Sequence, residues 1–244
     1  MGPEVVVDPG EKTTVDITLP VLNEARTLEN NTHILVGSLA LYDDYNWCIT
    51  IVDNGSTDGS WDIAERIACT TSNVRAVRLE RPGRGGALKA AWSSSTSDIV
   101  AYMDIDLSTS LDALTSLVDP IATGTADIVI GSRLAPESDV TRTIQRELIS
   151  RIYNVIARAA LSYPIRDAQC GFKAASRNVV SSIMPSIEDT SWFFDTELLV
   201  LAHRKGLRIK EVPVRWAEDA DSRVRILKTS LDDLRGIWRL RARH

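Results

Sequence analysis

The stretch Asp98-Ile-Val-Ala-Tyr-Met-Asp-Ile-Asp-Leu-Ser-Thr109 decides the fold of this chain. Its apolar, β-favouring run, residues 99–103, predicts a short buried strand. The run stops at Asp104-Ile105-Asp106, so two carboxylates lie one residue apart where the strand leaves its sheet. In open α/β sheets, ligands bind at this end of the strands, and carboxylate oxygens suit a hard divalent cation that carries phosphates. Taken by itself, the pattern also fits a strand end that is simply exposed to water.

Similar runs recur along the chain and alternate with helical patterns. Strand-like composition is found in residues 13–19, 47–52, 74–79 and 127–130, and we expect the first strand to end at Pro20. Helical patterns occupy residues 25–41, 87–95 and 111–122. A further helix follows the second strand, and Asp58 or Ser60 can cap its beginning. This alternation predicts an α/β fold in which helices flank a mainly parallel, Rossmann-like sheet.

After Arg133 the pattern changes to a C-terminal helical elaboration. Helical periodicity covers residues 143–161, 176–184 and 195–205, a further strand covers 208–214, and residues 226–241 are amphipathic. We therefore expect a flexible lead-in at residues 1–12, one domain over residues 13–225, and a basic amphipathic C-terminal helix over residues 226–244.

Composition narrows the class of protein. The chain has 244 residues and is 44% hydrophobic, which is enough for one large domain with its own core. Its net charge of -5 argues against a general nucleic-acid binder. The three cysteines are far apart and predict reduced thiols in a cytoplasmic protein. No apolar run of membrane-spanning length and no leader pattern is visible, so we expect a soluble or peripheral protein.

Three further loops follow predicted strands, at residues 20–24, 53–59 and 81–86. Asp53 can accept a hydrogen bond from a base ring N–H, and Gly55 and Gly59 permit turns that side chains would block. The third loop offers backbone N–H groups together with Arg81 and Arg84 for an anion. Each loop alone also fits an ordinary turn. Neither the spacing of a dinucleotide fingerprint nor that of a P-loop is present. In a parallel sheet all these loops meet at one edge, where they would hold a base, a ribose and a metal-bound diphosphate.

These motifs together resemble a known family. Pro-Val-Leu-Asn-Glu24, Asp53-Asn-Gly-Ser-Thr-Asp, Arg84-Gly-Gly-Ala and Asp104-Ile-Asp, in this order, are similar to those of inverting glycosyltransferases of family 2, which have the GT-A fold. Gly131-Ser-Arg, Ile165-Arg-Asp-Ala-Gln-Cys-Gly-Phe-Lys173 and Trp192-Phe-Phe-Asp-Thr-Glu-Leu-Leu199 resemble the dolichyl-phosphate β-glucosyltransferases and related polyprenyl-phosphate sugar synthases. The resemblance covers nearly the whole chain.

The resemblance implies roles for individual residues. A nucleotide-sugar site would comprise Pro20, Leu22, Glu24, Asp53, Arg84, Gly86, Asp104, Ile105, Asp106 and Arg223. Asp104 and Asp106 would lie at a Mg²⁺ or Mn²⁺ site, with Asp106 as the main ligand. Arg133, Gln169 and Lys173 would lie on the acceptor side, and Asp106, Arg133 and Asp195 would be catalytic. Many relatives have a Gln that helps to hold the metal where this chain has Ser108, which puts a third protein ligand in doubt.

The implied reaction is metal-dependent, inverting transfer of a hexose from a nucleotide diphosphate sugar, UDP-glucose first, to a polyprenyl monophosphate. The expected partners are these two substrates, an anionic membrane surface contacted by the basic tail, and a small multi-pass membrane protein; nucleic acid is not expected. We expect a peripheral protein on the cytoplasmic face of a membrane. GDP-mannose or a UDP-N-acetylhexosamine as donor stays open. So does a hydroxyl acceptor, for which Asp195 or Asp167 would act as base. A nucleotidyltransferase lacks its glycine-rich signature here, and the paired aspartates argue against an inactive binding module.

Overall fold

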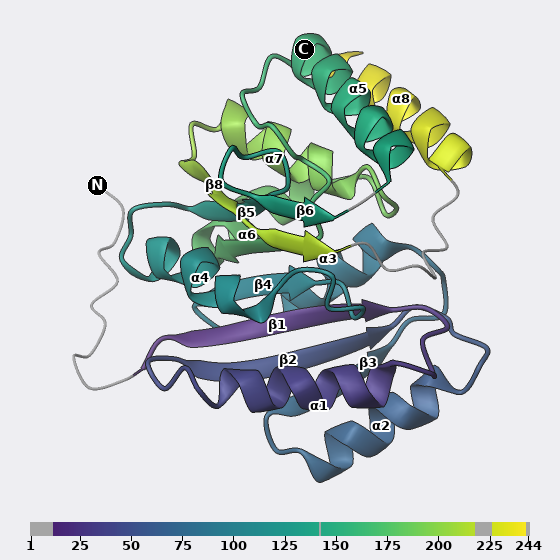
Figure 1. Ribbon diagram of the computed structural model, residues 1–244, viewed down its shortest axis with the longest axis vertical. Coiled ribbons are helices and arrows are strands. Elements are labelled where there is room, and N and C mark those ends of the chain that lie inside the picture. The colour runs from purple at the N-terminus through teal and green to yellow at the C-terminus, as the bar shows by residue number, and fades with distance from the viewer. Residues whose placement is uncertain (1–11, 142, 218–225, 243–244) are drawn as a thin grey trace.

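A computed structural model describes residues 12–141, 143–217 and 226–242 of the chain (Figure 1). In the first half, strands and helices alternate as the sequence predicts. The elements are β1 (Thr14–Val21), α1 (Leu28–Leu39), β2 (Asn46–Asp53), α2 (Ser60–Thr70), β3 (Val74–Arg78), α3 (Arg84–Ser94), β4 (Ile99–Met103), the 3₁₀ helix η1 (Leu111–Ala113), α4 (Leu114–Ala122) and β5 (Ile128–Ser132). The expected lead-in, residues 1–12, lies almost entirely outside the described residues.

The second half adds helices and short strands. Its elements are β6 (Asp139–Thr141), α5 (Ile144–Leu161), β7 (Phe172–Ser176), α6 (Arg177–Ile183), the 3₁₀ helix η2 (Met184–Ser186), α7 (Phe194–Arg204), β8 (Ile209–Pro213), β9 (Arg215–Ala217) and α8 (Ile226–Ala242). The long helices α5 and α8 pack side by side at one end of the molecule (Figure 1). The sequence analysis predicted neither β7 nor the small parallel pair β6–β9.

The main sheet has seven strands in the order β3-β2-β1-β4-β7-β5-β8. Only β7 runs against the others: it is antiparallel to both β4 and β5, while the remaining pairings are parallel. Because Phe172, the first residue of β7, lies opposite Met103, the last of β4, β7 enters the sheet at the carboxyl edge of the parallel strands. The block that precedes β7 therefore reaches the same edge as the loops after β1, β2 and β4.

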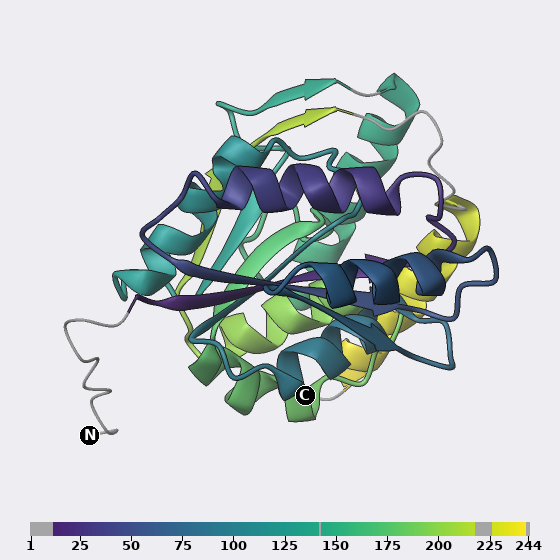
Figure 2. The ribbon, with the colours of Figure 1, turned by 90° about the horizontal axis from the view of Figure 1, so that it is seen from below.

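Apolar side chains from helices cover both faces of this sheet. One core cluster joins the sheet to α1, α2 and α4, and the other joins it to α3, α6 and α7 and continues to Ile237 and Leu240 of α8. Figure 2 shows α1 on one side of the sheet and the helices of the second cluster on the other. Phe193 and Phe194 are buried in that second cluster, as expected of core residues.

The expectation that β1 ends at Pro20 is wrong. The strand continues to Val21, and Pro20 lies opposite Val52 of β2. Proline is tolerated there because β1 pairs with β4 only as far as Thr18, so beyond that residue one side of the strand has no ladder that needs an N–H. The turns predicted at Gly55 and Gly59 are present, since both residues have positive φ, +82° and +88°.

Throughout the described ranges, no helix has the length and apolar character needed to cross a bilayer.

Candidate active site

The loops after β1 and β2 are bound to each other by side-chain hydrogen bonds. Asn23, which has positive φ, donates its backbone N–H to Ser56 Oγ at 2.9 Å and accepts the Thr57 N–H on its Oδ1 at 2.8 Å. The Glu24 N–H donates to Ser60 Oγ at 2.8 Å. Two segments separated by about thirty residues therefore form one frame at the carboxyl edge of the sheet. Leu22, which the sequence assigned to the nucleotide-sugar site, is 43% exposed on this frame.

Asp53 ends β2 beneath that frame and is fully buried. Its Oδ1 accepts the Ser56 N–H at 3.3 Å. Its Oδ2 has no hydrogen-bond donor within the described part of the chain, and its nearest cation is Arg78 Nε at 3.4 Å. A buried acceptor that lacks a donor costs about 1–3 kcal/mol, so a hydrogen bond from the ring N–H of a base to this oxygen would be stabilising. Arg78 also stacks on the Trp61 ring at 5.5 Å, which adds a flat apolar surface beside the carboxylate.

The backbone N–H groups of the glycine-rich loop, residues 81–86, do not form the anion site that we expected from the sequence. The N–H groups of Gly85 and Gly86 donate to the carbonyls of Ser191 and Thr190, at 3.1 and 3.0 Å, and the Gly83 N–H donates to Asn54 Oδ1. These donors are therefore not available to an anion. The glycines serve close packing instead, because a Cβ on Gly83 would lie 2.5 Å from the Thr190 carbonyl oxygen. Gly86, assigned to the nucleotide-sugar site, lies against this segment.

Asp104 and Asp106 follow the end of β4 in a turn, in which the Leu107 N–H donates to the Asp104 carbonyl at 3.3 Å. Ile105 between them is buried, and its carbonyl accepts the Asn31 side-chain amide at 2.9 Å. The Asp104 side chain is 45% exposed, and Asp106 is exposed with its Oδ1 accepting the Ser108 N–H at 2.9 Å. Both carboxylates therefore reach solvent from one strand end.

This pair fits a divalent cation that is only partly held by protein. No group of three or more His, Cys, Asp or Glu side chains with metal-site geometry occurs among the residues that the structure describes. Two exposed carboxylates are the hard oxygen donors that Mg²⁺ and Mn²⁺ accept, and diphosphate oxygens and water would complete the shell. The residues present are compatible with the metal that the sequence implies.

Asp104 is also the exposed end of a buried ionic network. Arg84 donates through Nη2 to Asp104 Oδ1 at 2.8 Å and through Nη1 to Asp195 Oδ2 at 2.6 Å. Lys173 Nζ lies 2.8 Å from Asp195 Oδ1 and 2.9 Å from the Tyr102 hydroxyl, which itself donates to Asp195. Burial raises the pKa of Asp195, but the charges of Lys173 and Arg84 outweigh it and hold that pKa below its ordinary value.

This network changes the interpretation of two predicted residues. Lys173 was expected on the acceptor side, but its side chain is fully buried and lies in β7 rather than in a loop. Asp195 was expected to be catalytic, but its side chain is 2% exposed and lies below the edge rather than at it. Arg84 joins both to Asp104, and Lys173 Nζ also donates to the Cys170 carbonyl, in the block before β7, at 2.5 Å.

Arg133 follows β5 and forms a two-pronged pair with Asp167. Its Nε and Nη2 donate to the two carboxylate oxygens at 2.8 Å each, and its guanidinium lies 5.5 Å above the Trp216 ring. Asp167 is fully buried; burial raises its pKa, but the adjacent Arg133 lowers it below the ordinary value. The Arg133 side chain is 14% exposed, so much of its charge is already compensated.

Gln169 connects the edge to the C-terminal helix. Its Nε2 donates to Asp233 Oδ2 on α8 at 2.8 Å. Burial raises the pKa of the Asp233 carboxyl to about 7. Arg223, which was expected to close over the diphosphate, lies outside the described residues.

A comparison with protein families identifies the family of this chain. Residues 16–184 match the model of the family described as Glycosyl transferase family 2. The chain belongs to this family. The matched range covers the edge that carries Asp53, Asp104 and Asp106, and the mainly parallel sheet is the GT-A fold that the sequence predicted.

Curated relatives of this chain include a glycosyltransferase and two proteins whose names contain a dolichyl phosphate or a polyprenol monophosphate. Glycosyltransferase AglD from Haloferax volcanii is 36% identical over 94% of this chain, which spans only 38% of that protein. Dolichyl-phosphate beta-glucosyltransferase ALG5C from Trichomonas vaginalis is 28% identical over 93% of the chain and 71% of its own length. Polyprenol monophosphomannose synthase from Mycolicibacterium smegmatis is 29% identical over 87% of the chain.

Solved structures share the fold of this family 2 enzyme. Glucosyl-3-phosphoglycerate synthase from Mycobacterium tuberculosis, in complex with Mn²⁺, UDP-glucose and phosphoglyceric acid, superposes with a TM-score of 0.69 at 23% identity, covering 94% of this chain and 79% of that one. At this identity the likeness concerns the fold.

Several residues that contact this edge were not predicted from the sequence. Tyr102 was placed only as part of a strand, although a tyrosine inside a fully buried apolar run signals a hydroxyl that needs partners. Trp192, whose ring lies 5.0 Å from the Arg84 guanidinium, and Asp233 gave no such signal. Their partners are distant in sequence, so only the fold brings them together.

Proposed function

We propose that this chain transfers a hexose from a nucleotide diphosphate sugar, with UDP-glucose as the first candidate, to a polyprenyl monophosphate, with inversion at the anomeric carbon. The names of the dolichyl-phosphate β-glucosyltransferases and of the polyprenol monophosphomannose synthase support this acceptor class. Among these relatives the glucosyltransferases recur, which is why we place glucose before mannose.

The donor side of the proposal rests on the edge of the sheet. Asp53 would accept a ring N–H of the base, because its buried Oδ2 is short of a donor. Asp104 and Asp106 would hold Mg²⁺ or Mn²⁺ on the diphosphate, where the cation would supply charge neutralisation of the leaving group. Pro20, Leu22, Glu24 and Ile105 would shape the pocket around the base and ribose.

The observation that carries the acceptor side is the state of Asp195 and Asp167, the two carboxyl groups that the sequence offered as a base for a hydroxyl acceptor. Asp195 and Asp167 are both buried, both are ion-paired, and both have lowered pKa values. A hydroxyl acceptor needs a base that can reach it and take its proton. A phosphate monoester is already an anion and needs none, so the buried, paired state of these carboxylates favours a phosphate acceptor. Arg133 and Gln169 would lie on its side of the site.

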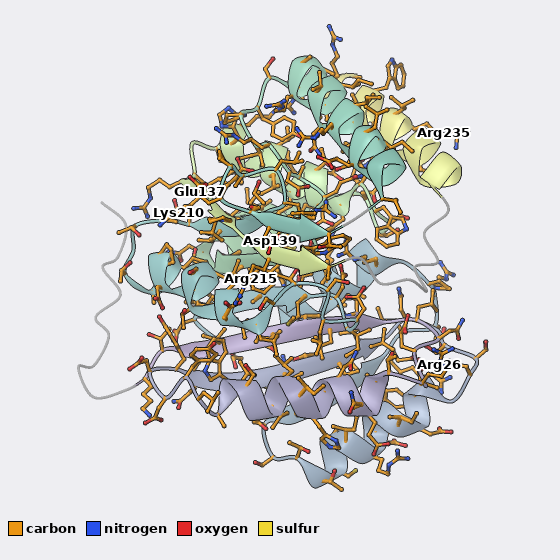
Figure 3. All side chains as sticks on the ribbon, in the orientation of Figure 1. Arg26, Glu137, Asp139, Lys210, Arg215 and Arg235 are labelled. Carbon is orange, nitrogen blue, oxygen red and sulfur yellow. The ribbon has the colours of Figure 1, made fainter. Side chains whose placement is uncertain are left out.

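Helices α5 and α8 support contact with a membrane surface. Large apolar side chains are exposed on both, namely Leu148, Ile152, Val155 and Ile156 on α5 and Leu234 and Trp238 on α8. Trp238 is 75% exposed, and the neighbouring Arg235, labelled in Figure 3, has an 81% exposed side chain. An apolar face with arginines beside it suits the headgroup region of an anionic bilayer, where a polyprenyl phosphate would reside. We therefore infer a peripheral enzyme on the cytoplasmic membrane face.

Flotation with liposomes tests the membrane contact. Wild-type protein should float with vesicles that contain anionic lipid, and Trp238→Glu together with Ile152→Glu should reduce the floating fraction by about tenfold. Ile34→Glu is the matched control, since Ile34 is 48% exposed on α1, which belongs to the opposite core cluster. Equal flotation of the double variant and the control would contradict the assignment of this surface.

A donor panel tests the reaction. UDP- and GDP-sugars are incubated with polyprenyl phosphate and Mg²⁺ or Mn²⁺, and label that extracts with lipid is counted. UDP-glucose should give the largest signal, and chelation of the cation should remove it. Highest transfer from GDP-mannose or a UDP-N-acetylhexosamine would show that the donor sugar is not glucose, and no lipid-extractable label from any donor would contradict the polyprenyl-phosphate acceptor.

A further inference from the structure

A set of buried charges lies directly behind the Asp104 carboxylate. Arg84 begins α3, Lys173 lies in β7 and Asp195 begins α7, and with Asp104 they make two cations and two anions. The four are connected in the order Lys173, Asp195, Arg84, Asp104, with contacts of 2.6–2.8 Å. The Tyr102 hydroxyl bonds Lys173 and Asp195 at the buried end.

Exposure falls steadily along this chain of charges. The side chain of Asp104 is 45% exposed, that of Arg84 10%, that of Asp195 2% and that of Lys173 0%. Burying an ion pair is expensive, and apolar residues of similar size stabilise a core at least as well. Packing alone therefore does not explain why Lys173 and Asp195 are charged. Lys173 also donates to the backbone carbonyl of Cys170, and within the described residues the side chain that joins this pair to the exposed Asp104 carboxylate is Arg84.

The surroundings hold this guanidinium in one place. The Tyr102 and Trp192 rings each lie 5.0 Å from the Arg84 guanidinium carbon. Gly171 covers the Arg84–Asp104 pair closely, since a Cβ on it would lie 2.9 Å from Arg84 Nη2 and would overlap Asp104 Oδ2. Arg84 is thus held against Asp104. The charges of Lys173 and Asp195 therefore influence the electrostatic potential at the Asp104 carboxylate through Arg84.

We propose that Lys173 and Asp195 are positioning residues that set, through Arg84, how strongly the Asp104 carboxylate attracts the divalent cation of the donor. This inference rests on the proposed donor site. It assigns Lys173 to the donor side of the reaction, in place of contact with the acceptor phosphate.

The two buried residues have opposite charges, so removing each should move cation affinity in opposite directions. Asp195→Asn leaves one excess positive charge in the network. Because the Arg84 charge is then no longer compensated by Asp195, it lowers the negative potential at Asp104 further and should weaken Mn²⁺ binding about tenfold. Lys173→Met leaves one excess negative charge and should strengthen Mn²⁺ binding about tenfold. The double variant Lys173→Met/Asp195→Asn restores neutrality and should bind Mn²⁺ within about threefold of wild type.

Asp16→Asn is the matched control, because it also removes a buried carboxylate from an ion pair. Asp16 is 2% exposed and lies 2.5 Å from Arg75 Nη2. It lies beside Val100, four residues before Asp104 along β4, which places it about 13 Å away. This variant should lower stability without changing Mn²⁺ affinity by more than about twofold.

The experiment is titration of the full chain with Mn²⁺, with and without UDP, reading free Mn²⁺ by electron paramagnetic resonance and folding by thermal denaturation. Opposite shifts in the single variants, with recovery in the double variant, support the proposal. Shifts in the same direction, no shift, or no recovery overturn it. If a single variant does not fold, Arg84→Gln replaces it: Mn²⁺ affinity should rise about tenfold because Asp104 loses its counter-charge, and a fall or no change overturns the proposal.

Hexose transfer by the wild-type protein is measured separately, so that failure of this inference can be distinguished from failure of the proposed function. Opposite Mn²⁺ shifts in a protein that transfers no hexose to polyprenyl phosphate would support the network and refute the reaction. Hexose transfer by the wild type, with unshifted Mn²⁺ affinities in the variants, would support the reaction and refute the role of the network. A higher KM for the acceptor in Lys173→Met, with Mn²⁺ affinity unchanged, would return Lys173 to the acceptor side and overturn the inference.

Discussion

Replacing Gly171 by alanine tests whether the geometry of Asp104 controls the reaction. Gly171 is not among the glycines with positive φ, so alanine is acceptable to the backbone and the effect is purely one of space. A Cβ there would lie 2.7 Å from Asp104 Cγ and 2.9 Å from Arg84 Nη2. Ordinary contact begins near 3.5 Å, so the carboxylate must move by about 1 Å or β7 must shift.

A displacement of about 1 Å in a group that holds the reacting diphosphate typically costs about 100-fold in rate. Gly171→Ala should therefore lower kcat/KM for hexose transfer by about 100-fold and stability by roughly 1–3 kcal/mol. Steady-state kinetics with saturating Mn²⁺ and thermal denaturation measure the two effects.

Gly37→Ala is the matched control. Gly37 lies in α1, and a Cβ on it would meet nothing within 4 Å. This variant should gain roughly 0.5–1 kcal/mol of stability and keep its kinetics, since alanine favours a helix interior. A Gly171→Ala enzyme with kcat/KM within twofold of wild type would refute the reasoning about Asp104.

Three further predictions concern single carboxylates. Asp106→Ala should abolish transfer without unfolding the protein, because this side chain is exposed; near-normal turnover would refute its assignment to the metal. Asp53→Asn should weaken UDP binding at least tenfold by calorimetry, through loss of a charge-assisted hydrogen bond; unchanged affinity would remove Asp53 from the base pocket. The pKa of Asp233, about 7 in the folded protein, is above its value in the unfolded chain. The folded state thus holds this proton more tightly, and stability should fall by at most about 4 kcal/mol as pH rises from about 4 to 7. Asp233→Asn should remove that loss in urea unfolding at pH 5 and 8, and an unaltered pH dependence would exclude Asp233 as its source.

Local patterns in the sequence predicted the elements that form the donor edge. The run before Asp104 and the alternation of strands and helices were sufficient for the α/β fold, because β1, β2 and β4 are largely buried runs that end in polar loops. The paired aspartates could be assigned because they directly follow the buried apolar run of β4, and in the structure both reach solvent with Ile105 buried between them.

Features that depend on contacts distant in sequence could not be predicted. β7 escaped notice because Lys173 interrupts its short apolar run, and its charge is acceptable only because Asp195 lies beside it. The glycine-rich loop looked like an anion site because nothing local indicates that Thr190 and Ser191 take its N–H groups. Pro20 looked like a strand end because the partial pairing of β1 with β4 is visible only in the sheet.

The most direct test of the proposed reaction offers UDP-glucose and Mn²⁺ two acceptors of equal length, a polyprenyl monophosphate and the free polyprenol. The mass of the lipid product is then measured. We predict hexose on the phosphate alone, formed by the wild-type protein and not by Asp106→Ala. Hexose on the polyprenol hydroxyl, or on neither lipid, would contradict transfer to a polyprenyl phosphate.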